Sequence, residues 1–291
     1  MIYLLFSVLA STTIFVIFKL FGRFKINILH AIVVNYLIAC TSGLIAFDRP
    51  ISIAVLRQFE WFYYAVALGA LFIIVFNLMA LTTQRSGLSV VSVATKMSLI
   101  IPIIFGLLYY KEHLGLLKFI GILFALIAVY LASAKESTGV SIGKNALVLP
   151  LLVFLGSGMI DTSIKFLEDA FVAENDVPLF SATIFGAAAI IGLLILLISI
   201  IRGDFKFEFK NIIAGIALGI PNYFSIYFLV KTLRSGLLDS SGIFTINNVL
   251  IVIVSTVLGI LLFKEKLSRK NWLGIDLALF SLLFFALAHI Q

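Results

Sequence analysis

The chain has 291 residues, of which 62% are hydrophobic and only 12% are charged. Average soluble domains carry about 25% charged residues, so this composition excludes a water-soluble globular protein and predicts an integral membrane protein with short loops. The formal net charge of +7 comes from 21 basic and 14 acidic residues. Most of them fall between apolar runs, where a basic excess is typical of membrane loops and not of a nucleic-acid-binding surface.

Ten apolar runs are each long enough, or nearly so, to cross a bilayer, which takes about 20 residues of helix. They cover residues 2–18, 28–47, 62–83, 87–110, 114–134, 146–167, 179–201, 212–230, 237–263 and 272–290. They lack the alternation of outer-membrane strands, so we predict an all-α membrane protein with ten transmembrane helices. The Gly/Ser/Lys-rich segment 135–145 predicts a linker after the fifth span.

Two motifs occur once in each half of the chain. Arg-Ser-Gly-Leu precedes the fourth span at 85–88 and the ninth at 234–237, and Lys-Glu follows these spans at 111–112 and 264–265. The repeat predicts two five-helix halves, residues 1–134 and 146–291. Because five is odd, the second half would cross the membrane upside down. Such inverted repeats place a substrate site near the midplane and support alternating access.

This organisation resembles the drug/metabolite transporter superfamily, and within it the EamA-like transporters. The resemblance rests on the short-looped spans, the two halves and the paired motifs, and it covers nearly the whole chain. It implies a permease or exporter, since superfamily members carry amino acids, nucleotide sugars, sugar phosphates, organic cations or other metabolites. These motifs identify the fold far better than the substrate.

Lys96 is the charge inside the fourth span, nine residues past Gly87 and therefore about 13 Å deep. A charge at that depth costs at least about 2.5–3.5 kcal/mol to insert, so it usually faces a bundle interior or a wet cavity. Ser92 lies one turn earlier on the same face. A buried cation favours an anionic or zwitterionic substrate. The alternative is a structural lysine paired across the bundle.

Further polar residues lie within other spans. Asp161 shares a face with Lys165 by i, i+4 spacing, so it reads equally as a local ion pair or as a site for a proton, a sodium ion or a substrate amine. Asn247 and Asn248 stand at the depth of Lys96 in the ninth span. Each amide in hydrocarbon needs partners, and hydrogen bonding between helices is its alternative role. The complete predicted substrate-binding set is Asn77, Ser92, Lys96, Asp161, Asn222, Tyr227, Asn247 and Asn248.

Other functions remain open at this point. An enzyme is least favoured, because no paired nucleophile and base and no metal-binding motif is found in the sequence; we predict no catalytic residue, cofactor or metal site, with H⁺ or Na⁺ as the candidate coupling ion. A lipid flippase or passive channel is the stronger rival, although polarity concentrates at mid-depth and not along a pore. The expected partners are a small-molecule substrate and the lipid bilayer but no nucleic acid, and a homodimer is compatible with the sequence.

We expect a multi-pass protein of the bacterial cytoplasmic (inner) membrane. Lys and Arg number 13 in the odd connections and 7 in the even ones, so the positive-inside rule places both termini outside. Relatives in the superfamily are commonly drawn with both termini inside. Membrane orientation, transport direction and substrate identity therefore stay open.

Overall fold

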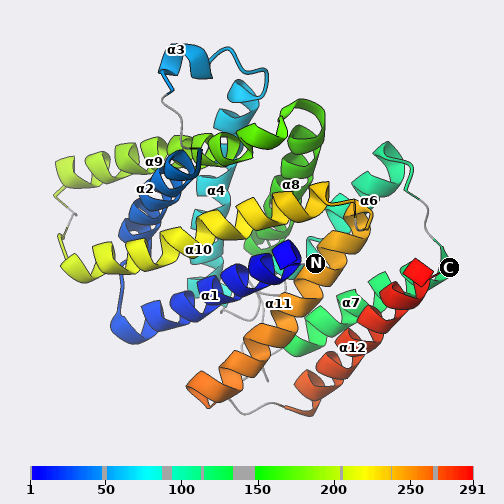
Figure 1. Cartoon of the computed structure of the whole chain (residues 1–291). Helices are drawn as coiled ribbons and strands as arrows, with labels where there is room; N and C mark the ends of the chain where they lie inside the picture. The colour runs from blue at the N-terminus through cyan, green and yellow to red at the C-terminus, as the bar shows by residue number, and fades with distance from the viewer. Residues whose placement is uncertain are drawn as a thin grey trace. The chain divides into compact units, whose positions relative to one another are not determined.

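A computed structural model describes residues 2–47, 51–86, 94–112, 115–133, 148–203, 206–236, 238–264 and 268–290. Every regular element in these ranges is a helix (Figure 1), which confirms the predicted all-α class. The long helices are α1 (Ile2–Phe24), α2 (Ile28–Phe47), α4 (Phe62–Ser86), α6 (Ile100–Tyr109), α7 (Leu116–Ser133), α8 (Val148–Phe171), α9 (Val177–Ile201), α10 (Phe209–Arg234), α11 (Ser240–Phe263) and α12 (Arg269–Ile290). Two short elements, α3 (Ile53–Leu56) and η2 (Glu174–Asp176), lie in connections.

The length and composition of these helices fit a multi-pass membrane protein. Within the described residues, seven are long and apolar enough to cross a bilayer, namely α1, α2, α4, α8, α9, α10 and α11. The stretches Ala94–Tyr109 and Leu116–Leu131 are shorter apolar helices. Each predicted span corresponds to a described helix, except that the run 87–110 is described only from residue 94 and is interrupted at 98–99. Ten membrane crossings and their inverted arrangement stay predictions. The predicted linker 135–145 lies outside the described residues.

The chain divides into two compact units, and each takes segments from both predicted halves. Unit 1 comprises Leu78–Thr162 and Thr232–Gln291, and unit 2 comprises Ile2–Asn77 and Ser163–Lys231. Unit 1 therefore contains α6 and α7 together with α11 and α12, while unit 2 contains α1 and α2 together with α9. Helices α4, α8 and α10 contribute residues to both units. Corresponding spans of the two predicted halves thus occur in the same unit.

In unit 1, α7 and α12 run side by side (Figure 1). Their close approach follows from small residues spaced four and three apart on α7, Gly121, Ala125 and Ala128, which form one face of the helix. A Cβ added at Gly121 would lie 2.9 Å from the ring of Phe285. Ser281 also donates a hydrogen bond to the backbone oxygen of Gly121 at 2.7 Å. The pairing of α7 with α12 is thereby closely fitted.

In unit 2, glycines again determine which helices approach. Gly215 and Gly219 on α10 form a Gly-x-x-x-Gly pattern, which lets two backbones come close. A Cβ at either position would lie 2.7 Å from a backbone oxygen of α2, that of Ala31 or that of Asn35. On the other side, α2 packs along α9. Helix α2 therefore contacts both α9 and α10.

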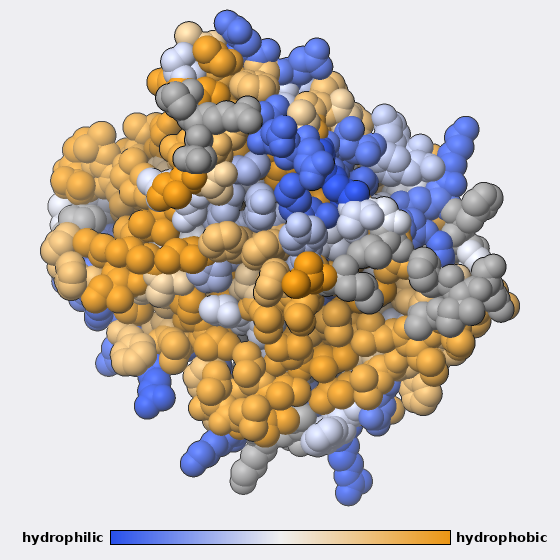
Figure 2. Space-filling view, viewed as in Figure 1, coloured by the Kyte–Doolittle hydropathy of each residue, from blue (hydrophilic) through white to orange (hydrophobic). Residues whose placement is uncertain are grey.

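Large apolar side chains are exposed along the spans, as a lipid-facing surface requires. On α9 they include Ile190, Leu194, Leu197 and Ile201, which recur at three- and four-residue intervals on one face. Figure 2 shows hydrophobic residues over much of α9 and α10, whereas hydrophilic residues gather over the end of α8 and η2. The connection between α8 and α9 carries the acidic residues Glu174 and Asp176.

Candidate functional site

Lys96 lies in a helical turn, residues 94–97, directly before α6. Its Nζ donates a hydrogen bond to Oδ1 of Asn248 on α11 at 3.0 Å. The amide nitrogen of Asn248 donates to the backbone oxygen of Phe244 at 2.9 Å, which fixes the orientation of the side chain with its oxygen toward the lysine. The structure thus brings together two predicted site residues from equivalent spans of the repeat.

The helix that carries Lys96 is interrupted two residues after it, between residue 97 and Ile100. The cause is Pro102, which has no N–H to donate to the backbone oxygen of Ser98. That oxygen accepts instead from the N–H of Ile101 at 2.9 Å. The single span predicted for residues 87–110 is therefore broken at this depth. Its first residues, including Ser92, lie outside the described residues.

Asn247 stands beside Asn248 on α11 and is buried, with 5% of its surface exposed. Its Oδ1 has no hydrogen-bond partner among the described residues. Leaving such an oxygen unpaired in an apolar environment costs several kcal/mol. Asn247 therefore presents a hydrogen-bond acceptor next to the cation-bound Asn248.

Asp161 on α8 interacts electrostatically with Lys96. Gly158 lets these helices approach, since a Cβ there would lie 2.3 Å from Cδ1 of Ile101 at the start of α6. Asp161 follows Gly158 by three residues and so lies on nearly the same helix face. Lys165, the alternative partner considered from spacing, forms ion pairs with Glu168 at 3.5 Å and Asp169 at 3.6 Å. The charge that acts on Asp161 comes from another helix.

Glu112 connects the end of α6 to the start of α11 and so helps to position Asn248. Its carboxylate accepts hydrogen bonds from the backbone N–H groups of Ser240 at 3.0 Å and Ser241 at 3.2 Å, and from the Ser240 hydroxyl. Gly106 makes room for it, because a Cβ there would lie 2.9 Å from Oε2 of Glu112. A carboxylate at a helix N-terminus pairs with unsatisfied N–H groups and with the helix dipole.

Asp239 caps the same helix by accepting from the N–H of Gly242 at 3.2 Å, and it forms an ion pair with Lys118 of α7. From the sequence, Asp239 is expected near the start of the ninth span, where the helix dipole tolerates an acid, but neither it nor Glu112 is predicted to position the site. The signal for Asp239 was available, because Asp directly before the first helical residue is a preferred N-cap. Glu112 could not be found this way, since its contact with Ser240 is made between segments distant in sequence.

The repeated Lys-Glu motif also has a local structural meaning. Lys111 and Lys264 both adopt left-handed backbone conformations, with φ of 52° and 51°, and each follows a glycine by five residues, Gly106 or Gly259. A residue in this conformation is a common way to end an α-helix. The two motifs therefore mark equivalent helix ends.

The remaining predicted site residues belong to unit 2. Asn77 donates to the backbone oxygen of Ile73 on its own helix at 2.7 Å. Asn222 donates to Oδ1 of Asn35 on α2 at 3.0 Å, and the ring of Tyr227 stacks on that of Tyr223 with centroids 5.7 Å apart. Within unit 1, by contrast, the structure brings Lys96, Asp161 and Asn248 together. Their role in substrate binding stays a prediction.

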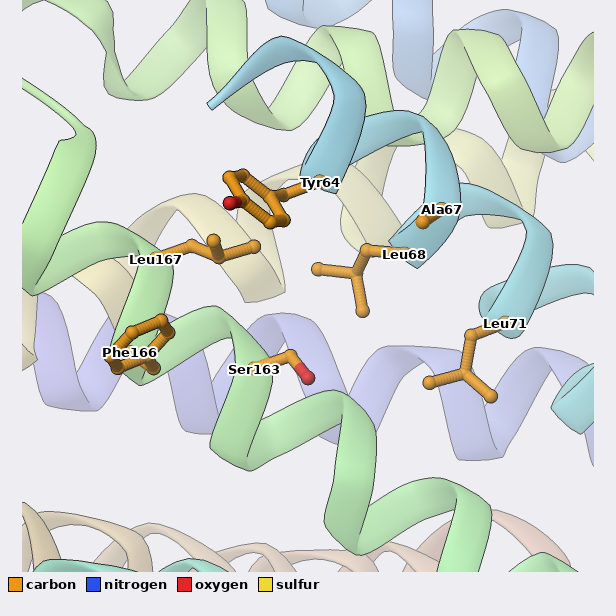
Figure 3. A pocket seen from close by; sticks show the side chains of 7 residues that line it. All are labelled: Tyr64, Ala67, Leu68, Leu71, Ser163, Phe166 and Leu167. Atoms are coloured by element: carbon orange, nitrogen blue, oxygen red, sulfur yellow. The ribbon is translucent and has the colours of Figure 1, made fainter. Parts of the chain in front are cut away.

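A cavity of about 250 Å³ lies in unit 2 (Figure 3) and is lined by Tyr64, Ala67, Leu68, Leu71, Ser163, Phe166 and Leu167. Side chains of α4 and α8 face each other across it. Its walls are largely apolar, and its lining contains none of the predicted site residues. This cavity therefore does not contain the anion-binding site that Lys96 predicts.

Comparisons with known proteins agree with this architecture. A protein from Haemophilus influenzae, described as uncharacterized, is 29% identical over 281 residues, which cover 95% of this chain and 94% of that protein. A crystal structure of another protein covers 99% of this chain and 96% of its own with a TM-score of 0.78, and its 13% identity shows a shared fold alone. The model of the EamA-like transporter family matches residues 1–134. The match agrees with the resemblance in the motifs, and residues 1–134 are similar to the EamA-like transporters, a family of membrane proteins.

Proposed function

We propose that the protein is a secondary active transporter, a permease or exporter, for a small anionic or zwitterionic metabolite. The observation that carries this proposal is the hydrogen bond from Lys96 to Asn248 between two apolar helices. Ionisable groups within membrane spans are rare and commonly mark substrate or ion pathways. A multi-pass membrane protein of the drug/metabolite type is the class that the EamA match supports.

Exchange of one hydrogen-bond acceptor for another gives Lys96 a way to recognise an anion. Its amine binds the neutral amide oxygen of Asn248. A substrate carboxylate or phosphate that replaced this oxygen would form an ion pair with the amine in place of a hydrogen bond to a neutral acceptor, which is the stronger interaction. Binding would separate the turn before α6 from α11, which links recognition to movement of two helices. Such a coupling is what alternating access needs.

The other polar groups of unit 1 suit a cationic group. Asp161 offers a negative charge within electrostatic reach of Lys96, and Asn247 offers the buried oxygen described above. A zwitterion would place its acid at Lys96 and its amine at these two acceptors. For a substrate without an amine, H⁺ or Na⁺ would occupy Asp161 as the coupling ion. The membrane concerned would be the bacterial cytoplasmic membrane.

Uptake into proteoliposomes tests the proposal. Lys96→Met removes the charge but keeps an unbranched side chain of similar length, and we expect it to abolish saturable uptake of the carboxylates and amino acids that the wild type carries. Lys96→Arg should retain part of the activity. The control is Lys270→Ala, which removes an exposed lysine of α12 and should transport normally. If the Lys96→Met variant takes up every compound of the panel at the wild-type rate, Lys96 does not bind the substrate.

Two further measurements separate the rival functions. A transporter shows counterflow, in which unlabelled substrate inside the vesicles accelerates entry of labelled substrate, whereas a passive channel does not. A lipid flippase would move a fluorescent phospholipid between leaflets and would not require the carboxylate panel. If the protein shows no counterflow but moves the fluorescent phospholipid, it is a lipid flippase and not a transporter of small metabolites.

A further inference from the structure

The cavity between α4 and α8 in unit 2 is large enough to hold a ligand of its own. Among the residues that line it, only Tyr64 and Ser163 have a polar side-chain atom (Figure 3). Its volume of about 250 Å³ exceeds the roughly 150 Å³ that holds benzene in an engineered apolar cavity. The cavity therefore suits a hydrocarbon segment and offers little to bind a charged ligand.

Both walls of the cavity continue as exposed apolar stripes along their helices. On α4 the stripe extends from Leu71 to Ile74, which is 55% exposed. On α8 it extends from Ser163 back to Met159 and Leu155, which are also exposed. Residues spaced three and four apart share one face of a helix. Because both helices are candidate membrane spans, the medium beside these stripes is the hydrocarbon of the bilayer.

The opposite face of α8 carries the groups of the candidate site. Asp161 precedes Ser163 by two residues, which is about 200° around an α-helix. Gly158, on nearly the same face as Asp161, packs closely on Ile101 at the start of α6. The residues of α8 that line the cavity are therefore not those that face Lys96.

One end of the cavity lies where α4 begins and α8 ends. Tyr64 is close to the start of α4, and its ring stacks on that of Phe171, the last residue of α8, with centroids 5.6 Å apart. Tyrosine is enriched at the level of the lipid headgroups. From Tyr64 to Leu71 the wall is about 10 Å long, and the hydrocarbon of one leaflet is about 15 Å deep. The cavity thus follows the path of an acyl chain from the headgroups inward.

The chain next to this end of the cavity is acidic. Residues 168–176 include four acidic side chains and no basic one. Glu174, three residues past Phe171, keeps 71% of its side chain exposed, although Lys231 donates a hydrogen bond to it at 3.0 Å. Such an excess of negative charge attracts an ammonium group and repels an anionic headgroup. The lipid that matches this end of the cavity therefore carries an amine.

We propose that this cavity is a lipid-binding site for a phospholipid whose headgroup bears an amine, as in phosphatidylethanolamine. One acyl chain lies between α4 and α8, and the headgroup lies beside the acidic connection 168–176. Lys96 and its partners take no part in this binding. Lipid binding and the proposed transport can therefore fail or succeed separately.

Photo-crosslinking of the full chain in phosphatidylglycerol nanodiscs tests the proposal. The probe is a small fraction of phosphatidylethanolamine with a diazirine in its acyl chain, and the comparison probe is phosphatidylglycerol with the same chain. Mass spectrometry locates the labelled residues. We expect the amine probe to label 64–71 and 163–171 more than the exposed face of α9. It should label them about 2- to 5-fold more than the comparison probe does, the effect of one exposed ion pair.

Two tryptophan variants separate the cavity from the lipid-facing surface in general. Ala67→Trp fills the cavity from an exposed position and should remove the excess labelling of 163–171. Ile74→Trp places the same ring beyond the cavity on the same stripe, and it should label as the wild type does. Glu174→Gln should reduce the preference for the amine probe.

The proposal is overturned if the wild type is labelled equally along α9 and in the cavity, because the lipid is then bulk solvent. It is also overturned if both probes label the cavity equally, or if Ala67→Trp keeps the wild-type labelling. The wild-type comparison decides the question even if Ala67→Trp fails to fold.

Discussion

Lys96 and Asn248 are 152 positions apart in the chain, yet the lysine amine lies 3.0 Å from the asparagine oxygen. One belongs to the fourth predicted span and the other to the ninth, which follow the same Arg-Ser-Gly-Leu motif. The two predicted halves therefore supply different chemistry, a cation and an amide, from segments that follow the same motif.

Replacing Asn248 should reveal how much the pair contributes to stability. Asn248→Leu leaves the buried amine without this acceptor, and we expect a loss of about 1–3 kcal/mol in the free energy of unfolding. Asn248→Asp should restore stability by supplying a carboxylate but should block anion binding. Denaturant unfolding in detergent micelles measures both. Ser255→Ala, on the same helix, is the control, and an Asn248→Leu variant as stable as this control would contradict the prediction.

Asp161→Asn should tighten anion binding. The substitution removes the negative charge that interacts with Lys96, so an incoming carboxylate no longer competes with it. We expect the Kd for propionate to fall by about tenfold, which corresponds to about 1.4 kcal/mol. Thermal-shift titration provides the measurement. Weaker binding by Asp161→Asn would mean that the carboxylate supports the anion site and does not compete with it.

Gly158→Ala should push α8 away from the start of α6. The added Cβ would lie 2.3 Å from Cδ1 and 2.7 Å from Cβ of Ile101, and such overpacking costs about 1–3 kcal/mol. Transport should fall as well, because Asp161 moves away from Lys96. The double variant Gly158→Ala/Ile101→Ala should recover part of both losses.

The control for this prediction is Gly22→Ala, since nothing lies within 4 Å of a Cβ at Gly22. Alanine is the better helix former by about 1 kcal/mol, so Gly22→Ala should be neutral or stabilising. Equal effects of the two substitutions on the unfolding free energy would show that α8 does not depend on the close approach at Gly158.

Removing the two carboxylates at the start of α11 should destabilise unit 1. Glu112→Ala deletes the acceptor of three hydrogen bonds, and Asp239→Ala deletes the N-cap. Each N-cap loss typically costs about 0.5–2 kcal/mol. The free energy of unfolding, measured with denaturant, and the rate of uptake should both fall, because α11 carries Asn248. Glu60→Gln, an exposed acid, should leave both unchanged.

Much of the helical layout could be predicted from hydrophobic runs alone. The span predicted at 28–47 coincides with α2, because both of its ends are marked by polar or charged residues. The run 87–110 was predicted as one span, but α6 begins at Ile100. A proline within a predicted span, such as Pro102, indicates a kink, but the sequence does not show where the backbone rearranges to pair the Ser98 oxygen.

The candidate site was predictable only in part. The repeated motifs predicted that Lys96 and Asn248 lie at equal depth, and the structure shows a hydrogen bond between their side chains. For Asp161 the sequence left two readings, because i, i+4 spacing describes neighbours on one helix and not contacts between helices. The close approach of α8 to α6 at Gly158 brings Asp161 toward Lys96, and this approach depends on the position of Ile101, which the sequence does not show. The partner of Asn222 was not predicted, since Asn35 of α2 has no charge that would set it apart in an apolar run.

The mixing of both halves within each unit has a consequence for how the protein is made. Helix α7 is synthesised well before α12, the helix that packs along its small-residue face. Until then Gly121 lacks the ring of Phe285 against which it packs. Severing the chain between 135 and 145 would give two fragments that each lack half of both cores. We expect neither fragment to persist alone in a cell, whereas co-expression of the two should rescue both from proteolysis.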